Sequence, residues 1–212
     1  MTLAHRLAAP PVLRLLRPLV HGAAHLPERG GVLLAANHLS NLDNYLLSAV
    51  TPRPVWYLGK RELARGLFGA FNVRMGMVPV DRGSGDRGAI DRLVELLRTG
   101  EAVAVFPEGT RSPTGELFRF RSGIARIARA AGVAVVPVGL RGTERVWPRG
   151  GWPRPRRPVR GLLEVRFGAA LDPPAADGGR ARRQWTEALR ANVAALSGQA
   201  TADTFAPVAE GS

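Results

Sequence analysis

The chain has 212 residues, of which 45% are hydrophobic and 22% are charged, and this balance is typical of a folded domain. It contains no cysteine, which excludes disulfides, cysteine-ligated metal clusters and a thiolate nucleophile. Thirty basic residues outnumber 17 acidic ones, giving a formal net charge of +13, and Lys60 is the only lysine. So basic a chain should be drawn to polyanions: nucleic acid, an anionic membrane or a phosphorylated substrate.

The N-terminal segment, residues 1–24, mixes apolar side chains with arginines. Pro10 and Pro11 are expected to break its apolar run. The run falls short of the roughly 20 apolar residues that span a bilayer, and the pattern of a signal peptide is missing. We therefore expect this segment either to lie at a membrane interface or to pack on the domain as a helix.

Beyond residue 24, apolar runs typical of strands alternate with runs of helical period. The runs predict strands at 31–37, 54–59, 77–81, 102–106, 133–140 and 162–167, and helical stripes at 90–97, 124–131 and 185–196. This alternation predicts an α/β fold: a single domain over residues 25–196 with a largely parallel central sheet flanked by helices. Pro79 lacks a ladder donor and therefore predicts an edge strand or a bulge. Residues 197–212 are expected to form a disordered tail.

Polar clusters directly follow four of the predicted strands, beginning at His38, Arg82, Pro107 and Arg141. Ligands of open α/β sheets bind beyond the carboxyl ends of the strands. If these strands run parallel, the four clusters meet at one edge of the sheet, and a site is predicted there.

His38 and Asp43 are five residues apart, so one continuous helix would hold their side chains about 140° apart. If His38 lies on a turn and Asn41 caps the following helix, Asp43 falls in the first helical turn and can face back toward the imidazole. The carboxylate would then fix the tautomer and leave the other ring nitrogen as a base. The alternative is a turn histidine beside a helix-capping aspartate.

The loop at 107–112 offers Glu108 and Arg111, which can bind a hydroxyl and a phosphate, or can form a local salt bridge within a turn. The glycine-rich segment 83–88 lacks the lysine of a phosphate-binding P-loop and is interpreted as a flexible turn. His21 and His25 have a spacing that could share a metal, but surface or packing roles are the default, and no metal is expected.

Four sequence blocks carry a resemblance to a known family. They are 37–43 (NHLSNLD), 76–82 (GMVPVDR), 106–112 (FPEGTRS) and 136–139 (VPVG). In this order and spacing they resemble the lysophospholipid acyltransferases, the 1-acylglycerol-3-phosphate acyltransferase family. The resemblance covers roughly residues 25–170.

The resemblance implies transfer of a fatty acyl chain from acyl-CoA or acyl carrier protein to the sn-2 hydroxyl of lysophosphatidic acid, giving phosphatidic acid. His38, oriented by Asp43, would be the base. Substrate-binding residues would be Glu108 for the glycerol, Arg111 with Arg82 for the phosphate, and Gly109 and Thr110 in the same loop. No cofactor is implied beyond the acyl donor. Another lysophospholipid, a glycolipid or an amino-acid lipid stays open as the acceptor.

A peripheral position on the cytoplasmic face of the cell membrane is expected, with no transmembrane span. Residues 141–161 hold seven arginines against one glutamate, together with two tryptophans, and membrane contact is the favoured interpretation. The alternatives are a solvated basic loop or contact with the acyl donor. A nucleic-acid-binding module is a remote alternative, because aromatics are only 6% and RNA-binding and zinc-finger motifs are missing.

Overall fold

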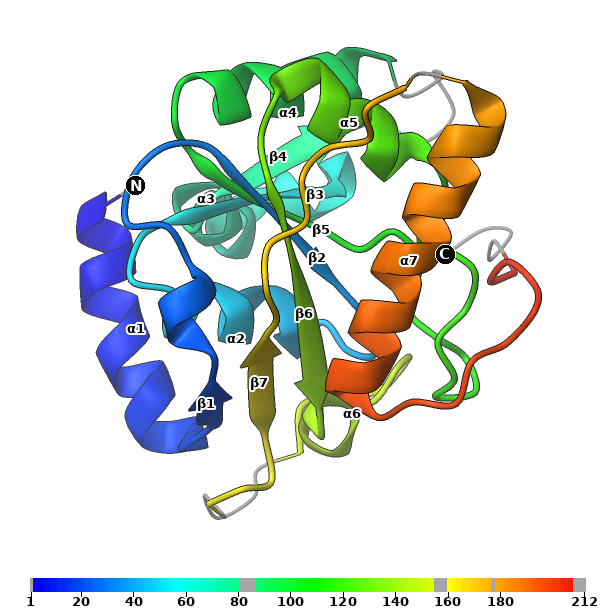
Figure 1. The fold of residues 1–212 in the computed structure, drawn as a ribbon. Coiled ribbons are helices and arrows are strands. Elements are labelled where there is room, and N and C mark those ends of the chain that lie inside the picture. Colours follow the sequence, from blue (N-terminus) through cyan, green and yellow to red (C-terminus); the bar gives the residue numbers. More distant parts are fainter. Residues whose placement is uncertain (1, 81–86, 155–159, 177, 208–212) are drawn as a thin grey trace.

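The computed structural model describes residues 2–80, 87–154, 160–176 and 178–207. Arg82, the glycine-rich segment at 83–86 and the last five residues of the expected tail lie outside these ranges. The described residues form one α/β unit in which helices flank both faces of a central sheet (Figure 1). This confirms the predicted fold class.

The sheet has seven strands among the described residues, in the order β1-β7-β6-β2-β5-β3-β4. Five strands run parallel to one another, and β7 lies antiparallel to β6 while pairing in parallel with β1. The bounds are β1 Leu19–His21, β2 Val32–Ala36, β3 Val55–Lys60, β4 Met77–Val80, β5 Ala102–Val105, β6 Val135–Arg141 and β7 Glu164–Phe167. All six predicted strands are confirmed; β1, with three residues, is too short to produce a pattern. Pro79 lies on β4, an edge strand as predicted.

The helices form two layers. Helices α4 (Arg87–Arg98), α5 (Gly123–Ala131) and α7 (Gly179–Ser197) cover one face of the sheet, and α1 (Thr2–Leu16) and α2 (Leu42–Val50) lie on the other (Figure 1). Short elements complete the chain: η1 (Ala23–His25), η2 (Arg61–Ala64), α3 (Gly66–Arg74) and α6 (Thr143–Val146). The three predicted helical stripes are confirmed as α4, α5 and α7.

Helix α1 differs from the expectation that its prolines break it. Pro10 and Pro11 both lie inside one continuous helix, and both are exposed, so their rings displace no packed neighbour. Ala9 is buried, and α1 packs along α2. We attribute the continuity of the helix to this packing, which outweighs the two missing N–H donors.

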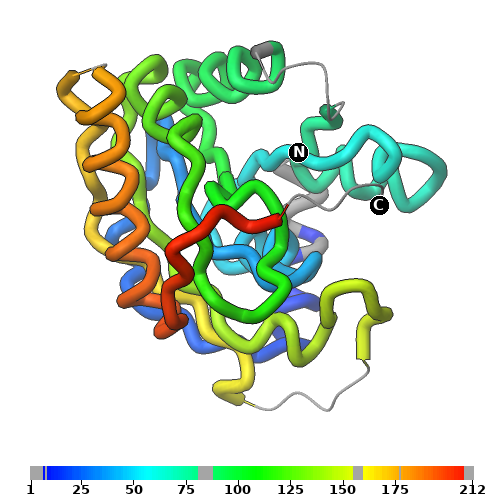
Figure 2. Tube along the Cα trace, turned by 90° about the vertical axis from the view of Figure 1, so that its right-hand side faces the viewer, coloured from blue at the N-terminus to red at the C-terminus, as the bar shows by residue number. Residues whose placement is uncertain are grey.

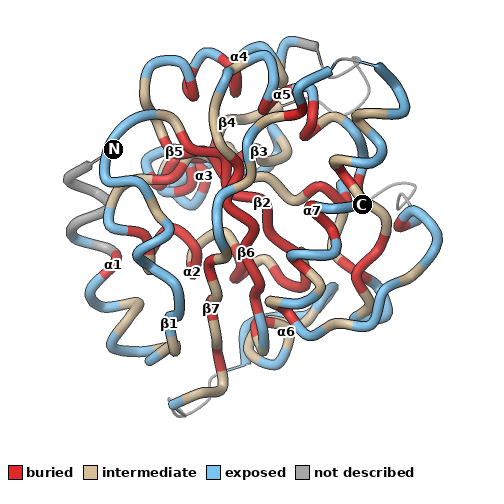
Figure 3. The backbone as a smooth tube through the Cα atoms, in the orientation of Figure 1, coloured by how far each residue is buried: buried red, intermediate tan, exposed pale blue. Residues whose placement is uncertain are grey.

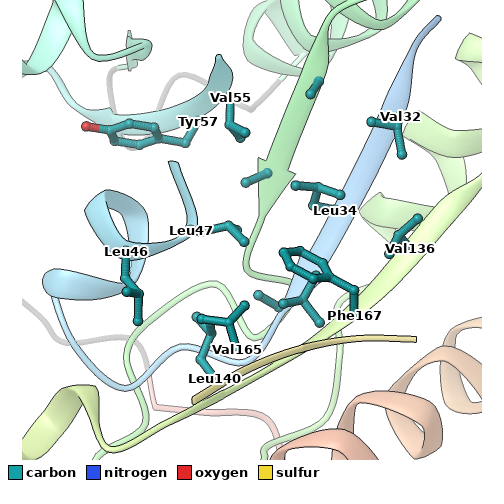
Figure 4. Close-up of a cluster of buried hydrophobic side chains, with 14 of the residues drawn as sticks. Val32, Leu34, Leu46, Leu47, Val55, Tyr57, Val136, Leu140, Val165 and Phe167 are labelled. Carbon is teal, nitrogen blue, oxygen red and sulfur yellow. The ribbon is translucent and has the colours of Figure 1, made fainter. Parts of the chain in front are cut away.

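The core consists of two apolar layers, one on each face of the sheet, and β2 and β6 are buried between them (Figure 3). Leu46 and Leu47 of α2 pack onto one face, where Leu34, Val136 and Phe167 also point (Figure 4). The opposite layer joins the sheet to α4, α5 and α7. The carboxyl ends of β2 and β6 are therefore held by packing on both sides.

The expected disordered tail is ordered up to residue 207. Leu117 donates its N–H to the Ala200 carbonyl (2.8 Å) and accepts from the Ala202 N–H (3.0 Å), and Arg119 donates its N–H to the Thr204 carbonyl (2.9 Å). Ala206 is buried. This order comes from backbone pairing with a distant loop, which composition does not reveal.

Close packing of α7 on β6 depends on Gly139. A Cβ at this position would overlap the backbone of Leu196 and Ser197. We expect Gly139→Ala to lower the free energy of unfolding by about 1–3 kcal/mol, since the helix must shift away from the sheet. Denaturant unfolding measures the change. Gly123→Ala is the matched control, because the space around Gly123 is open; equal stability of the two variants would contradict the prediction.

Candidate active site

The polar clusters that follow β2, β5 and β6 meet at one edge of the sheet, because these strands are parallel neighbours. Asn37, at the end of β2, ties this edge together. Its side chain donates to the Leu140 carbonyl (2.9 Å) and accepts from the Leu140 N–H (2.7 Å) of β6. The predicted convergence is confirmed for the described residues, while Arg82 lies outside them.

His38 and Asp43 form a hydrogen-bonded pair at this edge. Helix α2 begins after Asn41, as expected, although the Asn41 side chain makes no capping bond. Asp43 lies in the first turn and faces back, with Oδ2 2.8 Å from Nδ1 of His38. The same oxygen accepts the backbone N–H groups of Leu39 (2.7 Å) and Ser40 (2.8 Å). The carboxylate thus fixes both the imidazole and the turn that carries it.

The imidazole has a fixed orientation, and among the described residues only its Nδ1 is hydrogen-bonded. Its ring stacks on Phe106, with centroids 4.0 Å apart and an interplanar angle of 19°. The His38 carbonyl accepts the Ser112 N–H (2.7 Å), so the turn is also joined to the loop after β5. Because the Asp43 carboxylate accepts at Nδ1, Nδ1 carries the proton, and Nε2 is left as a base. The His38 side chain is 15% exposed, against 0% for Asp43.

Glu108 holds two backbone segments together. Its Oε1 accepts the His38 N–H (2.9 Å) and its Oε2 accepts the Phe118 N–H (3.0 Å). The residue is fully buried. In this structure Glu108 positions the site through these two backbone contacts, and its assignment to the glycerol of the substrate stays a prediction.

Burial raises the pKa of Glu108 from 4.5 to about 7. The two backbone N–H groups favour the carboxylate and oppose this rise, while the neighbouring Asp43 charge adds to it.

The rest of the loop after β5 lies at the surface of the site. Gly109 has φ +81°, a conformation that favours glycine, and a Cβ there would come 2.8 Å from Nε of Arg121. Thr110 and Arg111 are half-buried. A guanidinium on this rim can bind a phosphate, so the assignment of Arg111, with Arg82, to an acceptor phosphate stays a prediction.

Several residues that position the site were missed from the sequence. Phe106 supplies the ring that stacks on His38. The only sequence signal for this contact was an aromatic residue directly before the 107–112 loop. Phe118 and Ser112 act through backbone N–H groups, for which side-chain identity carries no information. Ser40 links the turn to the Trp147 carbonyl (2.6 Å), a contact 107 residues away in sequence.

His21 and His25 do not lie on one helix. His21 ends β1, and His25 ends η1 with Nδ1 2.9 Å from the Phe167 carbonyl. This is a packing interaction, in line with the default interpretation. Across the described ranges, no cluster of three histidine, aspartate or glutamate side chains suited to a metal is present.

The fold and the site together define an α/β protein with a histidine–aspartate pair suited to general-base chemistry on a hydroxyl. The family model Acyltransferase matches residues 17–141, more than half of the chain, and the chain belongs to this family. Its structure is similar to the crystal structure of the 1-acyl-sn-glycerophosphate acyltransferase PlsC from Thermotoga maritima. The TM-score is 0.70 at 25% identity, over 92% of this chain and 79% of that one.

Curated relatives agree with this placement. The chain is 31% identical over 157 residues to a 1-acyl-sn-glycerol-3-phosphate acyltransferase of Pseudomonas aeruginosa, covering 72% of this chain and 58% of that protein. It is 39% identical over 114 residues to the lyso-ornithine lipid O-acyltransferase of the same organism, covering 53% and 43%. A chloroplastic 1-acyl-sn-glycerol-3-phosphate acyltransferase of Arabidopsis thaliana is 35% identical over 136 residues, covering 62% and 38%. The chain thus spans between two fifths and three fifths of the length of these relatives.

None of the helices in the described part of the chain has both the length and the apolar character needed to cross a bilayer.

The raised pKa of Glu108 predicts a dependence of stability on pH. The folded state holds the proton up to about pH 7 and the unfolded chain only to about pH 4.5. Folding is therefore favoured by protonation, and the contribution of Glu108 to stability falls as the pH rises through this window, by about 3 kcal/mol in total. Glu108→Gln, which cannot ionise, should lose this fall. Denaturant unfolding of both proteins at pH 5, 6, 7 and 8 measures this fall in the free energy of unfolding. If the two proteins show the same pH dependence, the raised pKa of Glu108 is refuted.

Proposed function

We propose that the protein is a 1-acylglycerol-3-phosphate O-acyltransferase, which transfers a fatty acyl chain from a thioester donor to the sn-2 hydroxyl of lysophosphatidic acid. The observation that carries the proposal is the 2.8 Å contact between His38 Nδ1 and Asp43 Oδ2, which leaves Nε2 as a base. Family membership supports acyl transfer. Relatives named for this activity support the acceptor.

The reaction follows from these groups as a direct displacement. Nε2 of His38 accepts the proton of the acceptor hydroxyl while its oxygen attacks the thioester carbonyl carbon. The C–O bond forms, the C–S bond breaks, and the proton held on Nε2 passes to the leaving sulfur. The products are an ester and a free thiol. Asp43 stabilises the imidazolium that forms in between and keeps the ring in place.

No covalent acyl-enzyme is needed in this proposal. The chain has no cysteine, and the hydroxyl that reacts belongs to the acceptor. The donor, acyl-CoA or acyl carrier protein, is part of the proposal, as is contact with an anionic membrane surface, for which the charge of +13 is favourable.

A second acceptor is supported by one specific comparison. Among the relatives described above, the highest identity, 39%, is to a lyso-ornithine lipid O-acyltransferase. The chemistry at the hydroxyl is the same, but this acceptor is an amino-acid lipid. A panel of acceptors assayed with one donor separates the two functions, because only the phosphate-bearing acceptor should depend on Arg111.

Thiol release tests the mechanism. Purified protein should release thiol from acyl-CoA or acyl carrier protein only when lysophosphatidic acid is present. His38→Ala and Asp43→Asn should each lower kcat by ~100-fold or more, since one loses the base and the other its tautomer and charge. Their matched controls, His21→Ala and Asp91→Asn, change exposed residues outside the site and should keep the wild-type rate. Wild-type turnover in His38→Ala would overturn the mechanism.

Arg111 tests recognition of the acceptor phosphate. Arg111→Ala should raise KM for lysophosphatidic acid by ~10–100-fold and change kcat less, because a charge-assisted hydrogen bond contributes about 1.5–3 kcal/mol. Steady-state kinetics at saturating donor measures this split. Arg126→Ala, on the exposed face of α5, is the control. An unchanged KM in the Arg111 variant would remove Arg111 from the acceptor site.

A further inference from the structure

Exposed apolar side chains are concentrated in one short segment. Leu63 of η2 is 48% exposed, and α3 adds Leu67 (93%), Phe68 (55%), Phe71 (43%) and Val73 (41%). We call these five residues the α3 apolar patch. They make up half of the large hydrophobic side chains that are exposed in the described part of the chain. Figure 2 shows their segment, in cyan, projecting from the body of the molecule on the right-hand side.

Helix α3 is inverted relative to an ordinary surface helix. A surface helix normally buries its apolar stripe and exposes its polar residues. In α3 the buried residues are Gly69 and Asn72, while Leu67, Phe68 and Phe71 point outward. Gly69 packs so closely on η2 that a Cβ would overlap the backbone of Ala64. The helix therefore exposes the side chains whose burial would stabilise it most.

Polar anchors fix this orientation. Oδ1 of Asn72 accepts the Tyr45 hydroxyl (2.6 Å), and Nδ2 of Asn72 donates to the Leu63 carbonyl (3.0 Å). The helix cannot rotate its apolar face inward without breaking both bonds. The exposure of the patch is thus built into the packing of η2 and α3, and it calls for an apolar partner.

The residues around the patch are mostly basic, which favours an anionic partner. Four basic residues, Lys60, Arg61, Arg65 and Arg74, flank it against a single acid, Glu62. A second copy of the chain would bring the same cations face to face, which disfavours self-association. An anionic bilayer surface offers both phosphate-rich head groups for the cations and an acyl region for leucine and phenylalanine.

We propose that the α3 apolar patch is the surface by which the protein docks onto an anionic lipid bilayer. The proposal rests on the proposed function for its choice of partner, because that acceptor is a lipid. It differs from the expectation that residues 1–24 or the 141–161 loop make this contact. Leu67 and Phe68 enter the interface between head groups and acyl chains, and the flanking arginines bind the anionic head groups.

The patch is mechanically joined to the active site. Tyr45, which holds Asn72, lies on α2 two residues after Asp43. Its ring stacks on Phe71 of the patch and on Trp147, with centroids 6.4 and 6.3 Å apart, and the Trp147 carbonyl in turn accepts the Ser40 hydroxyl. Docking through α3 therefore places the histidine turn at a fixed position relative to the bilayer.

Vesicle binding without substrate tests the proposal. Co-sedimentation of the full chain with phosphatidylglycerol–phosphatidylcholine vesicles should show strong binding that weakens with salt and is weak on pure phosphatidylcholine. The double variant Leu67→Ser/Phe68→Ser should lower the partition coefficient by ~10–100-fold, since two apolar side chains no longer enter the interface. Its thermal unfolding should change little, because Leu67 is almost fully exposed and Phe68 is more than half exposed.

The matched controls are Leu15→Ser on α1 and Trp152→Ser in the 141–161 loop. Both residues are exposed apolar side chains, 62% and 89% exposed, and both variants should bind like wild type. Wild-type binding by the α3 double variant overturns the proposal, as does loss of binding in either control alone. A concentration-dependent dimer that the double variant abolishes, seen by analytical ultracentrifugation without vesicle binding, would assign the patch to a second copy and also overturn it.

A vesicle-free assay distinguishes failure of the proposed function from failure of the docking surface. A water-soluble short-chain lysophosphatidate allows thiol release to be measured without vesicles, and the α3 double variant should keep the wild-type rate in that assay. Vesicle binding that requires α3, in a protein that releases no thiol, refutes the acyltransferase and leaves the docking surface in place. If the protein releases thiol but the α3 double variant binds vesicles like wild type, the docking surface is refuted and the acyltransferase proposal stands.

Discussion

The geometry of the candidate active site depends on one carboxylate oxygen. Oδ2 of Asp43 accepts three N–H groups, from the imidazole of His38 and from the backbone of Leu39 and Ser40. The turn that carries the histidine and the acid that polarises it are therefore a single hydrogen-bonded unit. The helix that carries Asp43 is held in turn by Leu46 and Leu47, which are fully buried against the sheet. The geometry of the base thus depends on the packing of α2 as much as on the two residues themselves.

A second buried carboxylate extends this arrangement to the next strand. Glu108 joins the histidine turn after β2 to the backbone at Phe118, and it carries no exposed surface of its own. The two acids have different tasks because their surroundings differ. Asp43 meets the imidazole directly, whereas Glu108 accepts only backbone groups and maintains the spacing of the two loops.

Much of this was accessible from the sequence, for physical reasons. The apolar runs that predict β2, β5 and β6 are buried in the core, where the pattern is strongest. Their parallel order brings the polar clusters at their ends together, so His38 could be placed beside the 107–112 loop. The two positioning contacts of Glu108 could not be predicted, because its partners are backbone N–H groups. The continuity of helix α1 through its two prolines and the ordered segment at 199–207 were also missed, since both depend on contacts with residues far away in sequence. The inversion of α3 has the same origin: Asn72 is buried by its bond to Tyr45, and no periodicity reports this bond.

The segment at 199–207 has a consequence for how the site is assembled during synthesis. Leu117 and Arg119, on either side of the Phe118 N–H that Glu108 accepts, are paired with residues 200–204. Translation proceeds from the N-terminus, so His38, Asp43 and Glu108 are made long before the loop after β5 acquires these bonds. In a nascent chain that has not reached Ala206, the loop that carries Glu108 lacks this support. Completion of the loop therefore waits until residues 200–206 have been synthesised.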